Sequence, residues 1–157
     1  MSAQSIFDHA PLGAIIRYSD CTPRPPERHR RKVQDWQRRN SSGRLVKKQA
    51  ATCVGQTIIP ASFTLHEGDF GSQGIIVLKV FKTFSVGSDL AFTVTERPVT
   101  GSTLIFDRPG DQGELVHVAA NQVDAEHWLS RHGYPQAVLQ TVTGEPIDGD
   151  PVEGRAA

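Results

Sequence analysis

The chain has 157 residues, which is close to the commonest size of one domain, so two independent hydrophobic cores are not expected. Hydrophobic residues make up 38% of it, and no stretch approaches the roughly 18 consecutive apolar residues that a membrane-spanning helix needs, which argues against a chain that crosses a bilayer. Lysine and arginine (17) balance aspartate and glutamate (17), so the formal net charge is zero.

The N-terminal part is predicted to contain one short strand, an extended arm and one helix. Residues 12–18 are apolar with two consecutive isoleucines, which is typical of a strand. Residues 22–26 contain three prolines and are expected to be extended, because proline disfavours helix at the residue before it. A helix is predicted over residues 27–40, with Pro26 at its first position.

This predicted helix has a cationic face and a narrow apolar edge. At about 100° per residue, five cations fall within roughly a third of the helical wheel. They are Arg28, Arg31, Lys32, Arg38 and Arg39. The adjacent arc holds His29, Val33 and Trp36, and we expect Trp36 to anchor the helix to a hydrophobic core.

From residue 60 the hydrophobic periodicity becomes that of strands. Segments rich in Val, Ile, Phe and Thr predict strands at residues 62–66, 74–86, 89–97, 102–106 and 114–118. Gly87-Ser88 predicts a hairpin between the second and third of these, and the fourth and fifth are expected to pair.

The C-terminal region is predicted to contain a helix, a closing strand and a tail. The helix covers residues 122–132, with Asn121 as its N-cap and Gly133 at its C′ position. Residues 137–143 predict the strand, and residues 144–157 are expected to form a disordered acidic tail. The expected fold is therefore α+β: a mainly antiparallel sheet of about five to seven strands, with the basic N-terminal helix and the C-terminal helix packed against it. Residues 1–143 would form a single domain, in which residues 22–49 are the basic arm and helix.

Charge is separated into blocks along the chain. Residues 22–49 contain ten basic and two acidic side chains, whereas residues 50–157 contain six basic and thirteen acidic ones. Such a cationic block matches the phosphate oxygens of a nucleic acid, and the release of counterions favours its binding. The candidate contact residues for a DNA or RNA backbone are Arg24, Arg28, Arg31, Lys32, Arg38, Arg39, Arg44, Lys47 and Lys48.

Two other interpretations of the cationic block remain open. It is either a solvated surface, or a docking surface for an acidic protein, which includes the acidic region of the same chain or of a second copy. Few aromatic side chains lie near the block, so a platform that stacks single-stranded bases is not indicated.

Other candidate sites carry weaker signals. His66, Glu67 and Asp69 lie within four residues, which suits acid–base chemistry in a small enzyme but equally a polar turn at a strand end. His117, His127 and His132 have no spacing typical of a metal site. Nucleophile elbows, phosphate-binding loops and dinucleotide motifs are absent from the sequence. We therefore expect no catalytic residue, no metal and no cofactor.

The sequence also predicts a cellular location. Residues 1–10 lack the pattern of a secretory signal, so we expect a cytoplasmic protein without contact to a membrane. In that compartment the two cysteines, Cys21 and Cys53, are expected to be reduced thiols.

Overall fold

The computed structural model describes residues 1–144. The predicted acidic tail, apart from Gly144, lies outside the described residues. The elements in chain order are α1 (Ala3–His9), β1 (Ile15–Ser19), α2 (Arg30–Arg39), β2 (Ser41–Gln49), β3 (Thr52–Val54), β4 (Thr57–Ile59), β5 (Ser62–Ser72), β6 (Ile75–Ser85), β7 (Ala91–Glu96), β8 (Thr103–Phe106), β9 (Leu115–Ala119), α3 (Gln122–Leu129) and β10 (Val138–Thr141).

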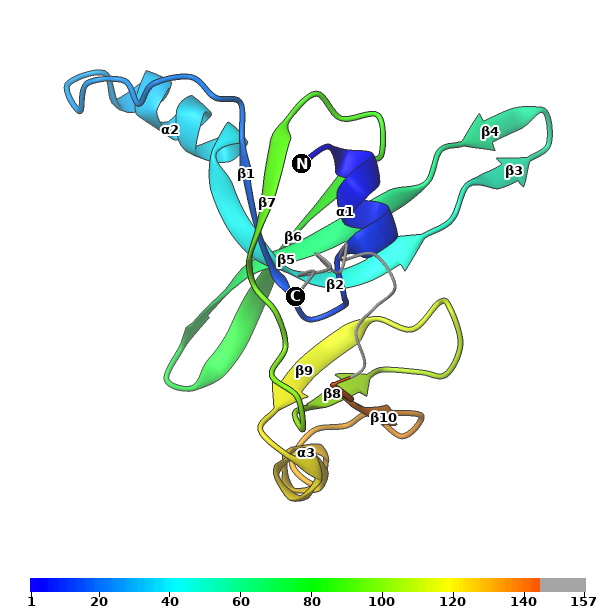
Figure 1. Ribbon diagram of the computed structural model, residues 1–157. Coiled ribbons are helices and arrows are strands. Elements are labelled where there is room, and N and C mark those ends of the chain that lie inside the picture. Colours follow the sequence, from blue (N-terminus) through cyan, green and yellow to red (C-terminus); the bar gives the residue numbers. More distant parts are fainter. Residues whose placement is uncertain (145–157) are drawn as a thin grey trace, which may run out of the picture.

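The strands form three antiparallel sheets (Figure 1). The largest has five strands in the order β6-β5-β2-β1-β7, the second has the order β10-β8-β9, and β3 pairs with β4. Helix α2 projects from the end of the five-stranded sheet, whereas α3 lies beside the three-stranded sheet. The predicted α+β class with mainly antiparallel strands is confirmed.

The main hydrophobic core lies on the five-stranded sheet and is built around four aromatic rings. Tyr18 of β1, Phe63 of β5, Phe84 of β6 and Phe92 of β7 have ring centroids 4.9–6.4 Å apart. Helix α1 closes this core through fully buried side chains, among them Ile6. Phe84 and Phe92 touch with a centroid distance of 5.2 Å although they come from opposite edges of the sheet. The sheet therefore curls until its two edge strands approach each other.

The predicted hairpin at Gly87-Ser88 is wrong. Strand β6 pairs with β5, where Phe84 lies opposite Phe63, and β7 pairs with β1, where Phe92 lies opposite Tyr18. The glycine and serine form a turn, as expected, but the chain then crosses to the other edge of the sheet. Turn residues determine local backbone geometry, whereas the partner of a strand depends on which edge lets its apolar side chains reach the core.

All seven predicted strands are present with shifted ends, but the sequence failed to predict α1 and strands β2, β3 and β4. Strand β2 carries Arg44, Lys47 and Lys48, which hide the alternation typical of a half-buried strand. Helix α1 has seven residues, too few for a clear helical period. Segments of this kind gain their stability from neighbours that are distant in sequence.

Both predicted helices exist, but each is shorter than expected. Helix α2 begins at Arg30, so Pro26 lies outside it, and its N-cap residue His29 makes no capping hydrogen bond through its side chain. Helix α3 has the predicted N-cap, because the side-chain oxygen of Asn121 accepts from the backbone N–H of Asp124 at 2.9 Å. It ends at Leu129, so Gly133 does not occupy its C′ position. None of the helices in residues 1–144 has the length and apolar character required to cross a membrane.

A candidate nucleic-acid interface

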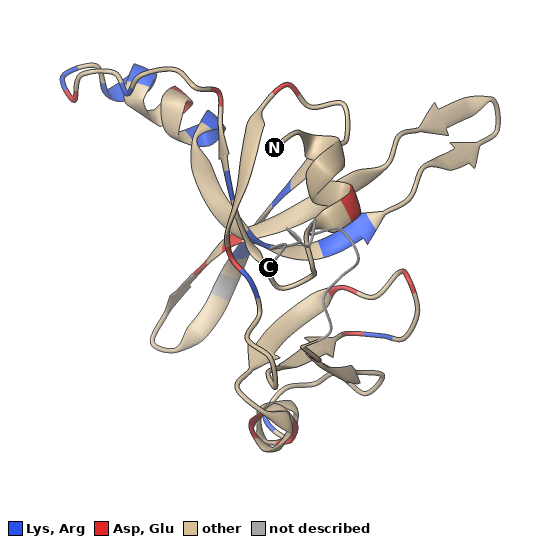
Figure 2. Cartoon of the chain, in the orientation of Figure 1, with Lys and Arg blue, Asp and Glu red and all other residues tan. Residues whose placement is uncertain are grey.

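The structure divides the predicted contact residues into two groups. The larger group is exposed on α2 and on the arm that precedes it: Arg24, Arg28, Arg31, Lys32, Arg38 and Arg39. Figure 2 shows this concentration of cations on the projecting helix. The smaller group, Arg44, Lys47 and Lys48, is half-buried on β2 in the middle of the five-stranded sheet.

Two of the cations on β2 are used inside the fold. The guanidinium of Arg44 donates to the backbone oxygen of Gly13 at 2.7 Å, and the Nζ of Lys48 donates to the backbone oxygen of Phe7 at 2.6 Å. Burial lowers the pKa of Lys48, against the opposing effect of the Asp8 charge. Arg44, Lys47 and Lys48 therefore lie on a central strand, apart from the exposed cations of the helix, and their contact with a nucleic acid stays a prediction.

Three of the exposed arginines have a carboxylate neighbour. Arg24 pairs with Glu27, Arg38 lies 3.6 Å from Asp35, and Arg39 lies 3.5 Å from Asp20. The three arginine side chains are more than half exposed, so water and salt screen the pairs and each contributes little to stability.

A second exposed set has no such neighbour. Arg28, Arg30, Arg31 and Lys32 form no ion pair with any carboxylate of residues 1–144. Arg30 is absent from the predicted contact residues because it falls outside the cationic third of the predicted wheel. Because the helix begins at Arg30, this residue and the two that follow form its first turn.

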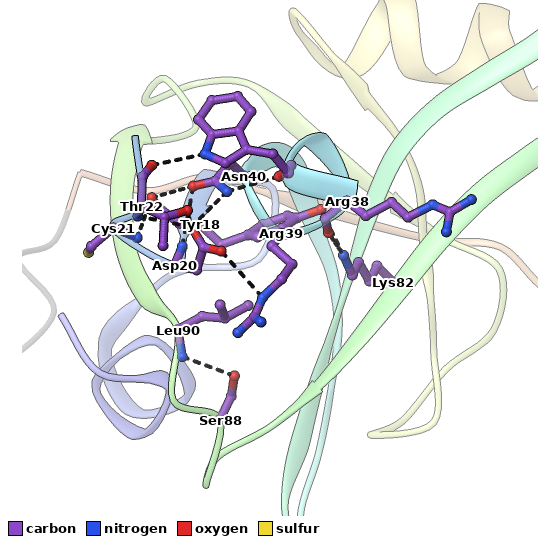
Figure 3. Close-up of polar contacts among 12 residues, drawn as sticks. Tyr18, Asp20, Cys21, Thr22, Arg38, Arg39, Asn40, Lys82, Ser88 and Leu90 are labelled. Atoms are coloured by element: carbon purple, nitrogen blue, oxygen red, sulfur yellow. Dashed lines mark hydrogen bonds and ion pairs between the residues drawn. The ribbon is translucent and has the colours of Figure 1, made fainter. Parts of the chain in front are cut away.

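The C-terminal end of α2 is held to β1 by the amide of Asn40 (Figure 3). Its Oδ1 accepts from the hydroxyl of Ser19 at 2.5 Å, and its Nδ2 donates to Asp20 and to the backbone oxygen of Trp36, both at 2.9 Å. Trp36 itself donates from its indole nitrogen to the backbone oxygen of Thr22 at 2.9 Å. Trp36 thus fastens the arm to the helix. It belongs to none of the hydrophobic clusters formed by residues 1–144, so the prediction that it anchors the helix to a core is wrong.

Asp20 is the charged member of this junction. Hydrogen bonds from Thr22 and from the Asn40 amide, together with the charge of Arg39, lower the pKa of Asp20 to about 2. Its carboxylate therefore stays ionised at neutral pH and accepts all of these bonds.

A second junction joins α2 to the edge strand β6. Lys82 of β6 donates to the backbone oxygen of Arg38 and to the hydroxyl of Tyr18, the latter at 3.2 Å. Tyr18 in turn donates to Glu67. Burial of the phenol, the hydrogen bond to Glu67 and the charge of that carboxylate raise the pKa of Tyr18, so it remains a neutral donor.

The predicted cluster of His66, Glu67 and Asp69 does not converge. His66 and Asp69 meet at 2.6 Å, but Glu67 is bound to Tyr18. All three lie inside β5 and not at the predicted strand end. Residues 1–144 contain no group of three side chains arranged to hold a metal ion.

The other three histidines also lack a metal-binding arrangement. His117 and His132 stack on the indole of Trp128, with centroid distances of 4.7 and 3.9 Å. Burial and the nearby charges of His132 and Arg44 lower the pKa of His117. The cluster packs α3 against β9, as expected for histidines with a structural role.

These features define a small α+β protein in which an antiparallel sheet carries a projecting cationic helix. The chain matches the family described as Uncharacterised conserved protein UCP036055 over residues 1–146, and it belongs to that family. Comparisons with curated proteins and with solved structures gave no match.

Proposed function

We propose that this protein is a non-enzymatic binding protein whose helix α2 and preceding arm contact the phosphate backbone of a nucleic acid. The observation that carries the proposal is the set of four exposed cations without a carboxylate partner in residues 1–144: Arg28, Arg30, Arg31 and Lys32. Guanidinium groups form strong charge-assisted hydrogen bonds with phosphate oxygens.

The position of these cations on the helix supports an anionic ligand. Arg30, Arg31 and Lys32 form the first turn of α2, which contains no acidic residue. The helix dipole makes this end positive, so three cations there repel both the dipole and one another. A phosphate bound at this end would offset that repulsion and would also accept from backbone N–H groups of the first turn.

The same geometry predicts binding without sequence preference. Trp36, the aromatic residue of the helix, is half-buried and its indole nitrogen is already bonded to Thr22. It is therefore not free to stack on a base. Contacts made by arginine and lysine with phosphates position a protein on nucleic acid but carry no sequence information.

The test is a titration of labelled duplex DNA and duplex RNA at about 50 and about 200 mM salt. About four to five phosphate contacts give a log–log salt slope of about −4 and a loss of affinity on the order of 10²-fold over this range. The variant Arg28→Ala/Arg31→Ala/Lys32→Ala is expected to reduce the magnitude of the slope by about 3.

The matched control removes three exposed cations elsewhere, in the variant Lys79→Ala/Arg97→Ala/Arg131→Ala. It changes the net charge by the same amount but leaves α2 intact, so we expect affinity and slope close to those of the wild type. Equal losses of nucleic-acid affinity in the two triple variants would show that net charge alone, and not the position of the cations on α2, determines binding. An absence of binding at the lower salt concentration, together with salt-sensitive self-association, would favour an acidic protein partner instead.

A further inference from the structure

A cavity of about 440 Å³ lies between the two larger sheets, remote from α2. Its apolar lining comes from α1, the loop after it, β8 and β10: Phe7, Leu12, Phe106 and Val138. Lys48 of β2 and Arg108 of the loop between β8 and β9 add positive charge to the wall. Pockets of roughly 300–1,000 Å³ with apolar walls and a few polar groups are typical of small-molecule sites.

Lys48 is the polar group of greatest interest in this wall. Its ammonium is half-buried, donates to the backbone oxygen of Phe7 and lies 5.9 Å from the centroid of the Phe7 ring. No carboxylate of residues 1–144 forms an ion pair with it. One hydrogen bond uses one of its three donors, so the ammonium still has donors to offer to an anion.

The remaining charges of the wall are either paired or exposed. Arg108 lies 2.8 Å from Asp107, whose carboxylate also accepts from the backbone N–H of Glu114 at 2.7 Å. Asp111 is exposed on the loop, where water screens its charge. The half-buried charge of Lys48 is screened less, so it dominates the recognition of a charged group.

We propose that this cavity binds a small monocarboxylate with an apolar body, its carboxylate on the Lys48 ammonium and its body against Phe7, Leu12 and Phe106. Such a ligand supplies the anionic partner that Lys48 lacks and covers apolar wall at the same time. The proposal is independent of nucleic-acid binding by α2.

The experiment follows backbone amide chemical shifts by NMR during titration with three probes of equal chain length: octanoate, octanol and octylammonium. Octanoate is expected to bind with shifts centred on Phe7, Leu12 and Phe106, and octanol to bind at the same place at least about 10-fold more weakly, because it cannot form a charge-assisted bond. Octylammonium is expected to bind more weakly still. Equal binding of octanoate and octanol, or tighter binding of octylammonium, would overturn the proposal.

Variants separate the role of Lys48 from that of the apolar wall. Lys48→Met is expected to weaken octanoate binding by about 10-fold or more. Octanol binding should be retained in this variant, which would show that the cavity persists. Lys47→Met removes a charge from the neighbouring position, which does not line the cavity, and should leave octanoate binding unchanged. Equal octanoate affinities in the wild type and Lys48→Met would refute the assignment.

The wild-type protein offers a check that does not depend on folding of the variant. Burial lowers the pKa of Lys48, so octanoate affinity is expected to fall at alkaline pH as Lys48 loses its proton, whereas octanol affinity should stay constant. An octanoate affinity that stays constant from neutral pH to beyond the ordinary lysine pKa of about 10.4 would count against Lys48.

Discussion

The amide of Asn40 joins the cationic helix to the sheet through both of its polar atoms. Its oxygen accepts from Ser19 while its nitrogen donates to Asp20 and to the backbone of Trp36. Few side chains offer a donor and an acceptor on one planar group, so the junction requires this residue type. This amide thereby links the end of α2 to β1.

Substitution Asn40→Ala is expected to lower the free energy of unfolding by about 1–2 kcal/mol, because it removes the side-chain donor to the Trp36 carbonyl, one of the donors to the Asp20 carboxylate and the acceptor of the Ser19 hydroxyl. Urea denaturation measures the change. Gln37→Ala, an exposed position on the same helix, is the control and should change stability by less than about 0.5 kcal/mol. Similar losses in both variants would show that helix propensity, and not the junction, governs the effect.

Asp20 makes the same junction sensitive to acid. Its folded-state pKa of about 2 lies below the unfolded value of about 3.9, so its contribution to stability is complete above that unfolded value and is lost as the pH falls toward 2. We expect amide hydrogen exchange in α2 to accelerate, relative to α3, over this interval. Asp20→Asn cannot titrate and should lack this component; an identical acid response in the variant would contradict the assignment.

Strand β2 is the element on which the five-stranded sheet depends, because it lies between β1 and β5. Its Gly43 permits a close approach of β5: a Cβ at this position would lie 2.8 Å from the backbone oxygen of His66 and 3.0 Å from the Cβ of Leu65. A Cβ atom essentially never comes so close to a backbone oxygen, so the strands would have to separate.

Gly43→Ala is therefore expected to destabilise the protein by about 1–3 kcal/mol, as overpacking of a well-packed region does. Gly68→Ala on β5 provides the matched control, since a Cβ there meets no atom within 4 Å. Thermal unfolding of the two variants decides the point. A melting temperature that falls equally in both would mean that glycine is not required at Gly43 for the approach of the strands.

The molecule as a whole separates a compact body from a projecting cationic segment (Figure 2). Fully buried residues come mainly from α1, α3 and the sheets, whereas Val33 is the buried residue of α2. The cationic segment is held to the body mainly by polar contacts at its C-terminal end.

This separation predicts the order of tryptic cleavage within the described residues. Bonds after Arg28, Arg30 and Arg31 should be cut first, because they lie in the exposed arm and at the free end of α2, where local unfolding costs little free energy. Bonds after Lys47 and Lys48 should resist, because β2 is paired on both sides. Mass spectrometry of a limited digest gives the order, and early cleavage in β2 would contradict it.

The sequence alone was sufficient for features that depend on a few neighbouring residues. Apolar runs and period-two alternation identified seven strands, Asn121 identified the start of α3, and the density of arginine identified an exposed cationic helix. Alternation, capping and local charge act over one or two turns of chain, so the evidence for them lies within each segment.

The pairing of strands and the accessibility of charges required the folded chain. Whether β7 pairs with β6 or with β1 depends on where Phe92 reaches the core. Whether Lys48 faces solvent or contacts Phe7 depends on strand β2, which the sequence pattern did not predict. Tyr18, Glu67 and Lys82 are brought together from three strands to hold the helix. Such contacts join residues far apart in sequence, and their free energy arises when the sheet closes around a shared core.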